Sequence, residues 1–132
     1  MALLRDYGQC TRVIRVYADD NGESHFEDRD IPLDDVTYGR ASHRLPASEL
    51  IFRETDTLDL HNPPRRQFIL FRKGVAELEA SDGTSRRLGP GDVLLADDIT
   101  GCGHQLRDVE ARTIAFVPVP DDFDVDSYLK PL

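Results

Sequence analysis

The sequence predicts a single-domain, all-β protein, and three observations support this expectation. Apolar and polar residues alternate with period two over short segments, as they do in strands with one buried face. Turn-forming residues recur about every 8 to 12 positions, which is typical of a β-sandwich or a β-barrel. The length of 132 residues suits one domain and is too short for two ordinary ones.

The first strands are expected to form a hairpin. Residues 12–17 are rich in β-branched and aromatic side chains and lead to Asn21-Gly22, a pair that supplies the positive φ angles of a tight turn. Residues 24–28 are the expected returning strand. Residues 31–46 are rich in proline, glycine and aspartate, so we expect a connecting excursion with one short strand. Residues 1–49 therefore precede the more regular part of the chain.

Residues 50–119 are expected to form the core of the fold. Alternate residues of 67–71 share one face, and the glutamates that alternate with apolar residues over 75–80 should be solvated. The apolar run at 93–96 predicts a strand buried on both sides. Residues 120–132 form an acidic tail that is expected to pack loosely. The expected strands are 50–53, 67–71, 75–80, 86–88, 93–96, 104–107 and 113–119, with turns at Gly74, Asp82-Gly83 and Gly89-Pro90-Gly91.

Composition argues against several kinds of partner. Sixteen Lys and Arg against 25 Asp and Glu give a formal net charge of −9, which repels nucleic-acid backbones and anionic membrane surfaces. The sequence has no apolar run near the roughly 20 residues of a membrane helix, no secretory signal pattern and no helix-turn-helix segment. We expect a cytoplasmic protein that binds neither nucleic acid nor membranes. Its two cysteines, Cys10 and Cys102, are expected to be free thiols.

Two histidine segments flank the strand-rich middle of the chain. The first is His61-Asn62-Pro63-Pro64-Arg65-Arg66-Gln67, and the second is Gly101-Cys102-Gly103-His104. A small β-barrel brings loops that are distant in sequence to one pocket, so His61 and His104 are the leading candidates for a functional site. The glycines before His104 allow a close approach of backbone and ligand.

Residues 53–118 resemble the cupin family, whose first motif runs Gly, five residues, His-x-His, three or four residues, Glu, six residues, Gly, and whose second motif ends Pro-x-Gly-x-x-His. His61 takes the place of the first metal-binding histidine, Gln67 that of the metal-binding glutamate, and His104 that of the last ligand. The chain also resembles a group of short bacterial cupin-domain proteins with similar His-Asn-x-Pro-Arg-Arg-Gln and Thr-Gly-x-Gly-His segments. The resemblance implies a cupin-like jelly-roll barrel with few or no helices, and a homodimer.

The metal-binding pattern of that family is incomplete in this chain. Pro63 replaces the second histidine, Gln67 the glutamate and Ile99 the proline, and the stretch from Gly91 to His104 is two residues longer than the family pattern. An amide oxygen holds a divalent ion poorly compared with a carboxylate. We therefore expect either no cofactor or one divalent metal ion. The expected metal ligands are His61, His104 and Gln67, with Asp97, Asp98 and His25 as candidates to complete the site.

The preferred alternative is proton transfer without a metal. An imidazole in an apolar pocket suits a general base, because desolvation disfavours its charged form. His61 and His104 are the expected acid–base groups, and Asp98 is a further proton carrier. Adjacent residues of a strand point to opposite faces, so only one of Arg65 and Arg66 should face inward, where a guanidinium would clamp a carboxylate or stabilise an enolate.

The sequence thus predicts an isomerase, cyclase or lyase that acts on a small acidic or polyketide-like molecule. The expected catalytic residues are His61, His104, Asp98 and Arg65, and the expected substrate-binding residues are Arg53, Arg66, Gln67 and Cys102. The alternatives are a metal-dependent cupin dioxygenase or lyase, and a binding protein without catalysis.

Simpler interpretations of the candidate residues also remain open. His61 is alternatively an exposed loop histidine, Gln67 a strand residue that satisfies backbone groups, and His25 and His43 surface or strand residues. Besides the family resemblance, a homodimer is favoured by residues 13–17, a strand that could pair with the edge of a neighbouring sheet.

Overall fold

The computed structural model describes residues 11–56, 60, 61, 63–107 and 111–132. Over these residues the chain is an all-β protein with one short helix, as the sequence predicted. The elements are β1 (Arg12–Ala18), β2 (Ser24–Asp30), β3 (Leu33–Val36), β4 (Gly39–Ser42), β5 (Ile51–Thr55), β6 (Leu60–His61), β7 (Gln67–Lys73), β8 (Ala76–Ala80), β9 (Ser85–Leu88), β10 (Val93–Asp97), β11 (His104–Arg107), β12 (Arg112–Pro118), α1 (Val125–Tyr128) and β13 (Lys130–Pro131).

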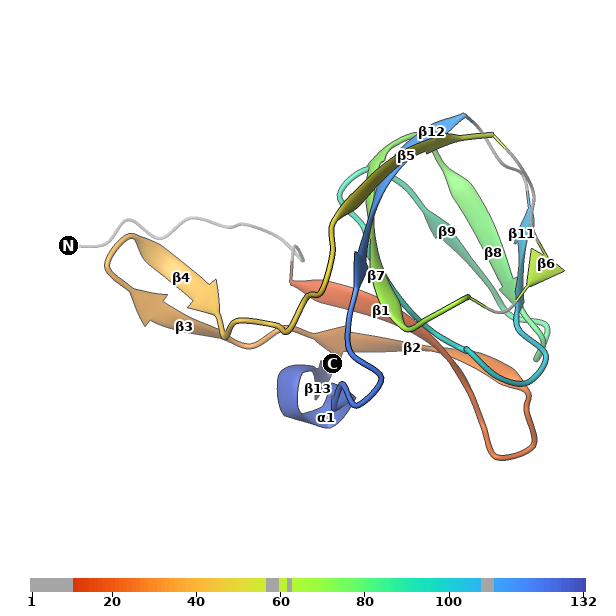
Figure 1. Cartoon of the computed structure of the whole chain (residues 1–132), viewed down its shortest axis with the longest axis horizontal. Coiled ribbons are helices and arrows are strands. Elements are labelled where there is room, and N and C mark those ends of the chain that lie inside the picture. Colours follow the sequence, from red (N-terminus) through yellow and green to blue (C-terminus); the bar gives the residue numbers. More distant parts are fainter. Residues whose placement is uncertain (1–10, 57–59, 62, 108–110) are drawn as a thin grey trace.

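The strands form two facing sheets and a separate hairpin (Figure 1). The larger sheet has seven strands in the order β13-β2-β1-β10-β7-β12-β5, and the smaller has four in the order β6-β11-β8-β9. In the larger sheet β1 and β10 are parallel, whereas the other neighbouring strands are antiparallel. Among the described residues these sheets stay separate, and no closed barrel is found.

The inner core lies between the two sheets. Ile14, Leu94 and Ile114 of the larger sheet pack against Leu78 and Leu88 of the smaller one. These five side chains are at most 5% exposed, and burial of such apolar surface is the main favourable term in folding. All of them occupy alternating positions of their strands, so the period-two pattern of the sequence leads directly to this core.

A second core covers the outer face of the larger sheet. Phe68 and Leu95 pack there against Phe123, Val125 and Leu129 of the C-terminal segment. The strand β10 is therefore buried on both sides, as predicted. The expectation of a loosely packed tail is wrong, because apolar residues between the aspartates anchor this segment and leave Leu129 fully buried.

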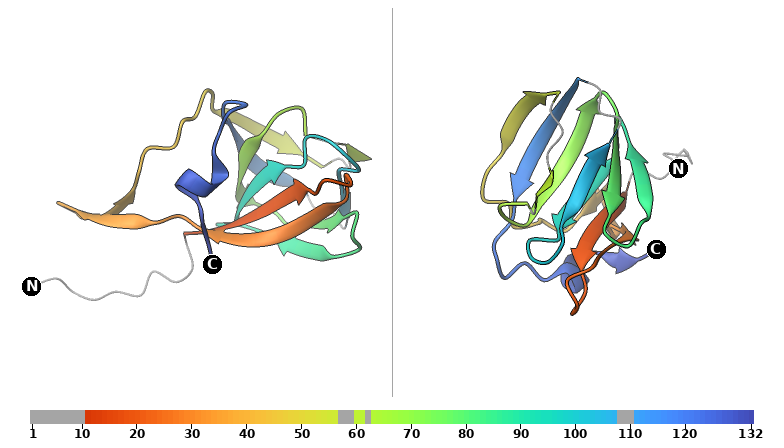
Figure 2. Two further views of the ribbon diagram at one scale, coloured as in Figure 1. Left: turned by 90° about the horizontal axis from the view of Figure 1, so that it is seen from below. Right: turned by 90° about the vertical axis from the view of Figure 1, so that its right-hand side faces the viewer.

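The excursion over residues 31–46 contains two strands where one was expected. Strands β3 and β4 pair as an antiparallel hairpin, which projects away from the two sheets (Figures 1 and 2). Val36 and Tyr38 near its tip are 52% and 97% exposed. Because the hairpin has no buried face, no period-two pattern marks its strands in the sequence.

The position of β1 corrects one argument for a homodimer. This strand lies inside the larger sheet, where β2 pairs with one side and β10 with the other. It therefore offers no free edge within one chain. The parallel partner β10 comes late in the sequence, and no local signal announces such a pairing.

The glutamates of β8, Glu77 and Glu79, are half-buried instead of fully solvated. In the described part of the chain, no helix has the length and apolar character needed to cross a membrane.

Candidate functional site

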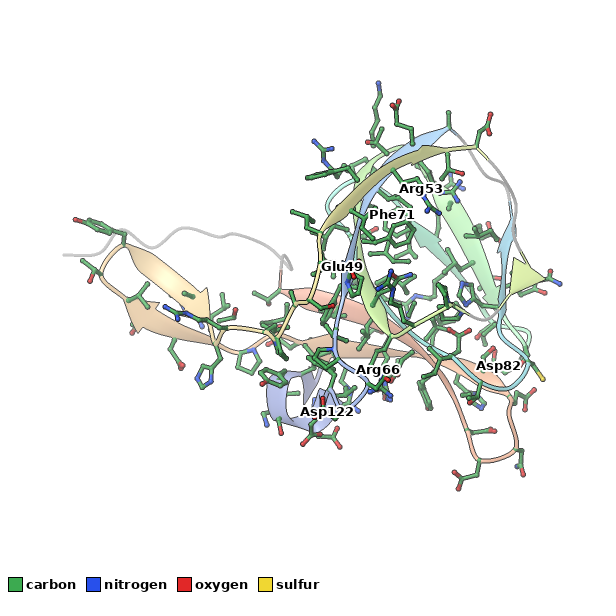
Figure 3. The ribbon with its side chains drawn as sticks, in the orientation of Figure 1. Glu49, Arg53, Arg66, Phe71, Asp82 and Asp122 are labelled. Carbon is green, nitrogen blue, oxygen red and sulfur yellow. The ribbon has the colours of Figure 1, made fainter. Side chains whose placement is uncertain are left out.

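A cavity of about 400 Å³ lies between the two sheets. Its walls come from β5, β7, β8, β10, β11 and β12 and from the segment Pro63 to Arg65. Side chains alternate along each strand, so each wall strand contributes every second residue. Figure 3 shows Arg53 and Phe71, two of these residues, within the space enclosed by the sheets. The volume is typical of a site for a small molecule.

The cavity is mainly apolar but contains several cationic and polar groups. Its apolar walls include Ile69, Phe71, Leu94, Leu106 and Ile114. Among the described residues, no aspartate or glutamate side chain lines the cavity. The polar and charged residues that line it are Arg53, Thr55, Arg65, Gln67, His104 and Arg112.

His104 and Asp98 form a hydrogen-bonded pair at one end of the cavity. Nδ1 of His104 lies 2.6 Å from Oδ2 of Asp98, and the two side chains are 10% and 0% exposed. A carboxylate only accepts hydrogen bonds, so Nδ1 carries the donated proton, and Nε2 is the ring nitrogen that Asp98 leaves unengaged. No described residue forms a hydrogen bond with Nε2. The ring is thus oriented by Asp98 with its basic nitrogen open to a ligand.

Gln67 lies at the same end of the cavity as this pair. It is 6% exposed and pairs across the sheet with Ala96 of β10. Asp98 follows Ala96 by two positions, which places Gln67 and Asp98 on the same side of neighbouring strands. The side-chain amide of Gln67 supplies hydrogen-bond donors to a ligand oxygen in this region.

Asp97 points to the outer face of the larger sheet, opposite to Asp98. It accepts hydrogen bonds from Nε and Nη2 of Arg15 at 2.9 and 2.6 Å and a further hydrogen bond from Nε of Arg66. Arg66 also donates to the backbone oxygens of Asp121 and Phe123. Arg66 therefore lies away from the cavity, where it fastens the C-terminal segment to the sheet.

The remaining arginines, Arg65, Arg53 and Arg112, all line the cavity. Arg65 lines the cavity, and its Nη1 lies 3.3 Å from Oε1 of Glu49 at the surface. Arg53 lines the cavity as well, and the roles expected for Arg65 and Arg53 toward a substrate stay predictions. Arg112, which is 6% exposed, was not singled out from the sequence. Its spacing of two from the inward-facing Ile114 is the signal that would have identified it.

The loop before His104 is held by contact with the β1–β2 hairpin. Gly101 has φ +79°, and a Cβ at this position would lie 2.3 Å from the backbone oxygen of Gly22. Cys102 donates its backbone N–H to that same oxygen at 2.8 Å. The close approach predicted for these glycines is thus made to the backbone of a neighbouring loop. The Cys102 side chain is exposed and does not line the cavity.

The two candidate histidines lie on paired strands. Cα of His61 is the register partner of Cα of His104 in the antiparallel pair β6–β11. The prediction for the His61 side chain lies outside the described residues.

The described donors do not fit a firmly held divalent metal ion. Nε2 of His104 and the Gln67 amide are the potential ligands in the cavity walls, and the Asp98 carboxylate is engaged by Nδ1. One imidazole and one amide are a weak donor set for such an ion. Asp97 cannot join them, because it lies on the outer face.

His25 also lies away from the cavity. Its Nε2 is 2.7 Å from Asp19 and its Nδ1 is 2.9 Å from Asp82. The hydrogen bond with Asp19, followed by that with Asp82, raises the pKa of His25 against the opposing effect of burial. His25, Asp19 and Glu23 place their donor atoms within 4.8 Å of one another. Both ring nitrogens are already engaged by carboxylates, which accounts for this cluster without a metal.

Comparison with known proteins gives no family assignment. No family model matches the chain, and no curated protein matches it.

Proposed function

We propose that this protein is a small-molecule enzyme that transfers a proton next to a carbonyl group, in an isomerisation, cyclisation or elimination. The observation that carries this proposal is the His104–Asp98 pair, with Nδ1 bound at 2.6 Å and the ring facing an apolar cavity. An oriented imidazole in such surroundings is a suitable general base. The proposed substrate is a small acidic or polyketide-like molecule.

The proposed chemistry assigns each group one task. Nε2 of His104 removes the proton from the carbon beside the carbonyl, the electron pair of the C–H bond forms a carbon–carbon double bond, and the π pair of the carbonyl group moves to its oxygen. The amide of Gln67, with the guanidinium of Arg65, stabilises the resulting enolate oxygen. The imidazolium then returns the proton to the same carbon, or to the conjugated γ carbon when the substrate is β,γ-unsaturated, while Asp98 keeps the ring in place. No step uses a metal, because the described donor set is weak.

We also propose that the protein is a member of the cupin family. The two-sheet body with a ligand cavity is compatible with a cupin-like jelly roll, and the spacing of His61, Gln67 and His104 supports membership of the cupin family. We also propose a homodimer on the basis of this resemblance. Its interface involves surfaces other than β1, which is already paired on both sides.

Proton exchange with solvent tests the proposed function with simple carbonyl compounds. Oxo acids and neutral ketones are incubated with the protein in D₂O, and deuterium incorporation beside the carbonyl is followed by ¹H NMR. His104→Gln is expected to lower the exchange rate by about 100-fold or more. His43→Gln, which alters an exposed histidine of the hairpin region, is the matched control. Equal rates in the two variants, or no exchange with any compound, would overturn the proposal.

A further inference from the structure

The charge of the cavity differs from that of the chain. Acidic residues outnumber basic ones by 25 to 16 in the sequence, whereas the described walls of the cavity contain Arg53, Arg65 and Arg112 and no acidic side chain. Arg53 is exposed to solvent, so its positive charge attracts an incoming anion. A cavity with this arrangement favours an anionic ligand with an apolar body.

Arg53 is the guanidinium best placed to receive the anionic group. Its Cζ lies 5.0 Å from the ring centre of Phe116, which also lines the cavity. Arg15, Arg29 and Arg66 of the same chain contact carboxylates, but within the described part of the chain no carboxylate contacts Arg53. The stacked ring holds the guanidinium plane and leaves its N–H groups free for a ligand.

Strand register gives the separation of Arg53 from the reactive end. Arg53 pairs with Ile114 of β12, which in turn pairs with Phe71 of β7, and the Arg53 side chain extends toward the Phe116 ring. Gln67 is four residues from Phe71 on the same strand, a backbone separation of about 13 Å, part of which the long Arg53 side chain spans. Apolar groups of Ile69 and Leu94, which face each other across β7 and β10, occupy the intervening wall.

We infer that the substrate is a monocarboxylic acid whose carboxylate binds Arg53 and whose carbonyl carbon lies several apolar carbon atoms away, beside His104. This inference rests on the proposed function, which fixes the reactive end of the substrate. One stacked guanidinium matches the two oxygens of a carboxylate through paired N–H donors. An acid with its carbonyl group remote from the carboxylate fits this geometry, whereas a 2-oxo acid does not.

The test compares a remote oxo acid with matched compounds. Isothermal titration is carried out with 5-oxohexanoate, its amide, 2-oxohexanoate, hexyl phosphate and the neutral ketone 2-heptanone. The wild-type protein is expected to bind 5-oxohexanoate about tenfold or more tightly than its amide, because only the acid forms the charge-assisted contact. Arg53→Gln is expected to abolish this preference.

Arg72→Gln is the matched control. Arg72 is an exposed arginine of β7 that also stacks on a phenylalanine, with Cζ 5.2 Å from the Phe52 ring, but it does not line the cavity. This variant should retain the preference for the acid. Equal effects of the two substitutions, or tighter Arg53-dependent binding of 2-oxohexanoate or hexyl phosphate, would overturn the inference.

The outcome separates this inference from the proposed function. If 2-heptanone shows His104-dependent deuterium exchange while acids bind no better than amides, the substrate class is wrong and the proton-transfer function stands. If acids bind through Arg53 and His104→Gln changes no exchange rate, the proton-transfer function is wrong. The ligand is then a carboxylic acid held without catalysis at Arg53, and the placement of a carbonyl beside His104 fails with the function.

Discussion

Asp97 and Asp98 are adjacent in the sequence and point to opposite faces of the larger sheet. Asp97 accepts hydrogen bonds from Arg15 and Arg66 on the outer face, while Asp98 holds His104 on the inner face. The alternation of a strand enforces this division. Asp97 therefore contributes to stability, and Asp98 contributes to the proposed chemistry.

Substitution of Asp97 tests its structural role. Asp97→Asn is expected to lower the free energy of unfolding by about 2 to 3 kcal/mol, because two guanidinium groups lose their charged acceptor. The Asp97 side chain is 3% exposed and those of Arg15 and Arg66 are about 20% exposed, so solvent compensates only in part. Urea unfolding followed by circular dichroism measures the change. Asp35→Asn on the exposed hairpin should change it by less than about 0.5 kcal/mol, and an equally small effect at Asp97 would contradict the assignment.

Much of the candidate site could be predicted at the level of single residues. His104 and Gln67 follow from the histidine segments, and Arg53 follows from its position in a strand. Arg112 was missed because the last strand was expected to begin one residue later, at 113. The role of Arg66 could not be predicted, since its partner Asp97 lies on a distant strand and only the folded sheet brings them together.

At the level of the elements, His25 connects two turns. It lies on β2 and contacts Asp19 in the β1–β2 turn and Asp82 in the β8–β9 turn. Both carboxylates accept hydrogen bonds, so the two contacts form together only when both ring nitrogens carry a proton. The hydrogen bond with His25 is the main cause that lowers the pKa of Asp19. The charged ring thus joins the larger sheet to the smaller one through two hydrogen bonds, whereas a neutral ring donates only one of them.

The stability of this contact should depend on pH. The pKa of His25 is raised in the folded state. The contribution of this contact to folding stability is therefore fully present below the unfolded-state pKa of about 6.5. It is lost as pH rises through the folded-state pKa. The difference in Tm between the wild type and His25→Gln is therefore expected to be largest just below a pH of about 6.5 and to shrink as the pH becomes alkaline. Thermal unfolding across this range measures the difference. A gap that stays constant with pH would contradict the contact, and His43→Gln should show no comparable trend.

The elements with a buried face were predictable, whereas those without one were not. Strands β7, β8, β10 and β12 follow from alternation or continuous apolar character, because burial imposes these patterns. The hairpin β3–β4 is exposed on both faces, so its sequence resembles that of a loop. The parallel pairing of β1 with β10 depends on contacts far apart in the chain, and local patterns carry no information about it.

At the level of the whole molecule, the larger sheet separates two cores with different tasks. The inner core merges with the cavity walls, since Leu94, Leu78 and Ile114 belong to both. The outer core consists of Val13, Phe68 and Leu95 beneath the C-terminal segment and contributes nothing to the cavity lining. The molecule can therefore keep a partly open ligand cavity on one face because a closed apolar layer stabilises the other face.

This separation predicts a variant that is unstable but retains its ligand site. Leu129→Ala removes a fully buried side chain of the outer core and is expected to cost about 3 kcal/mol in the free energy of unfolding, through lost transfer energy and a residual cavity. Leu132→Ala, at a position that is 65% exposed, should change stability by less than about 0.5 kcal/mol. Because no described residue of the outer core lines the cavity, the affinity of the folded Leu129→Ala protein for 5-oxohexanoate should match that of the wild type. Urea unfolding measures the loss of stability, and isothermal titration well below the Tm of the variant measures its ligand affinity. A loss of affinity that accompanies the loss of stability would show that the two cores are coupled.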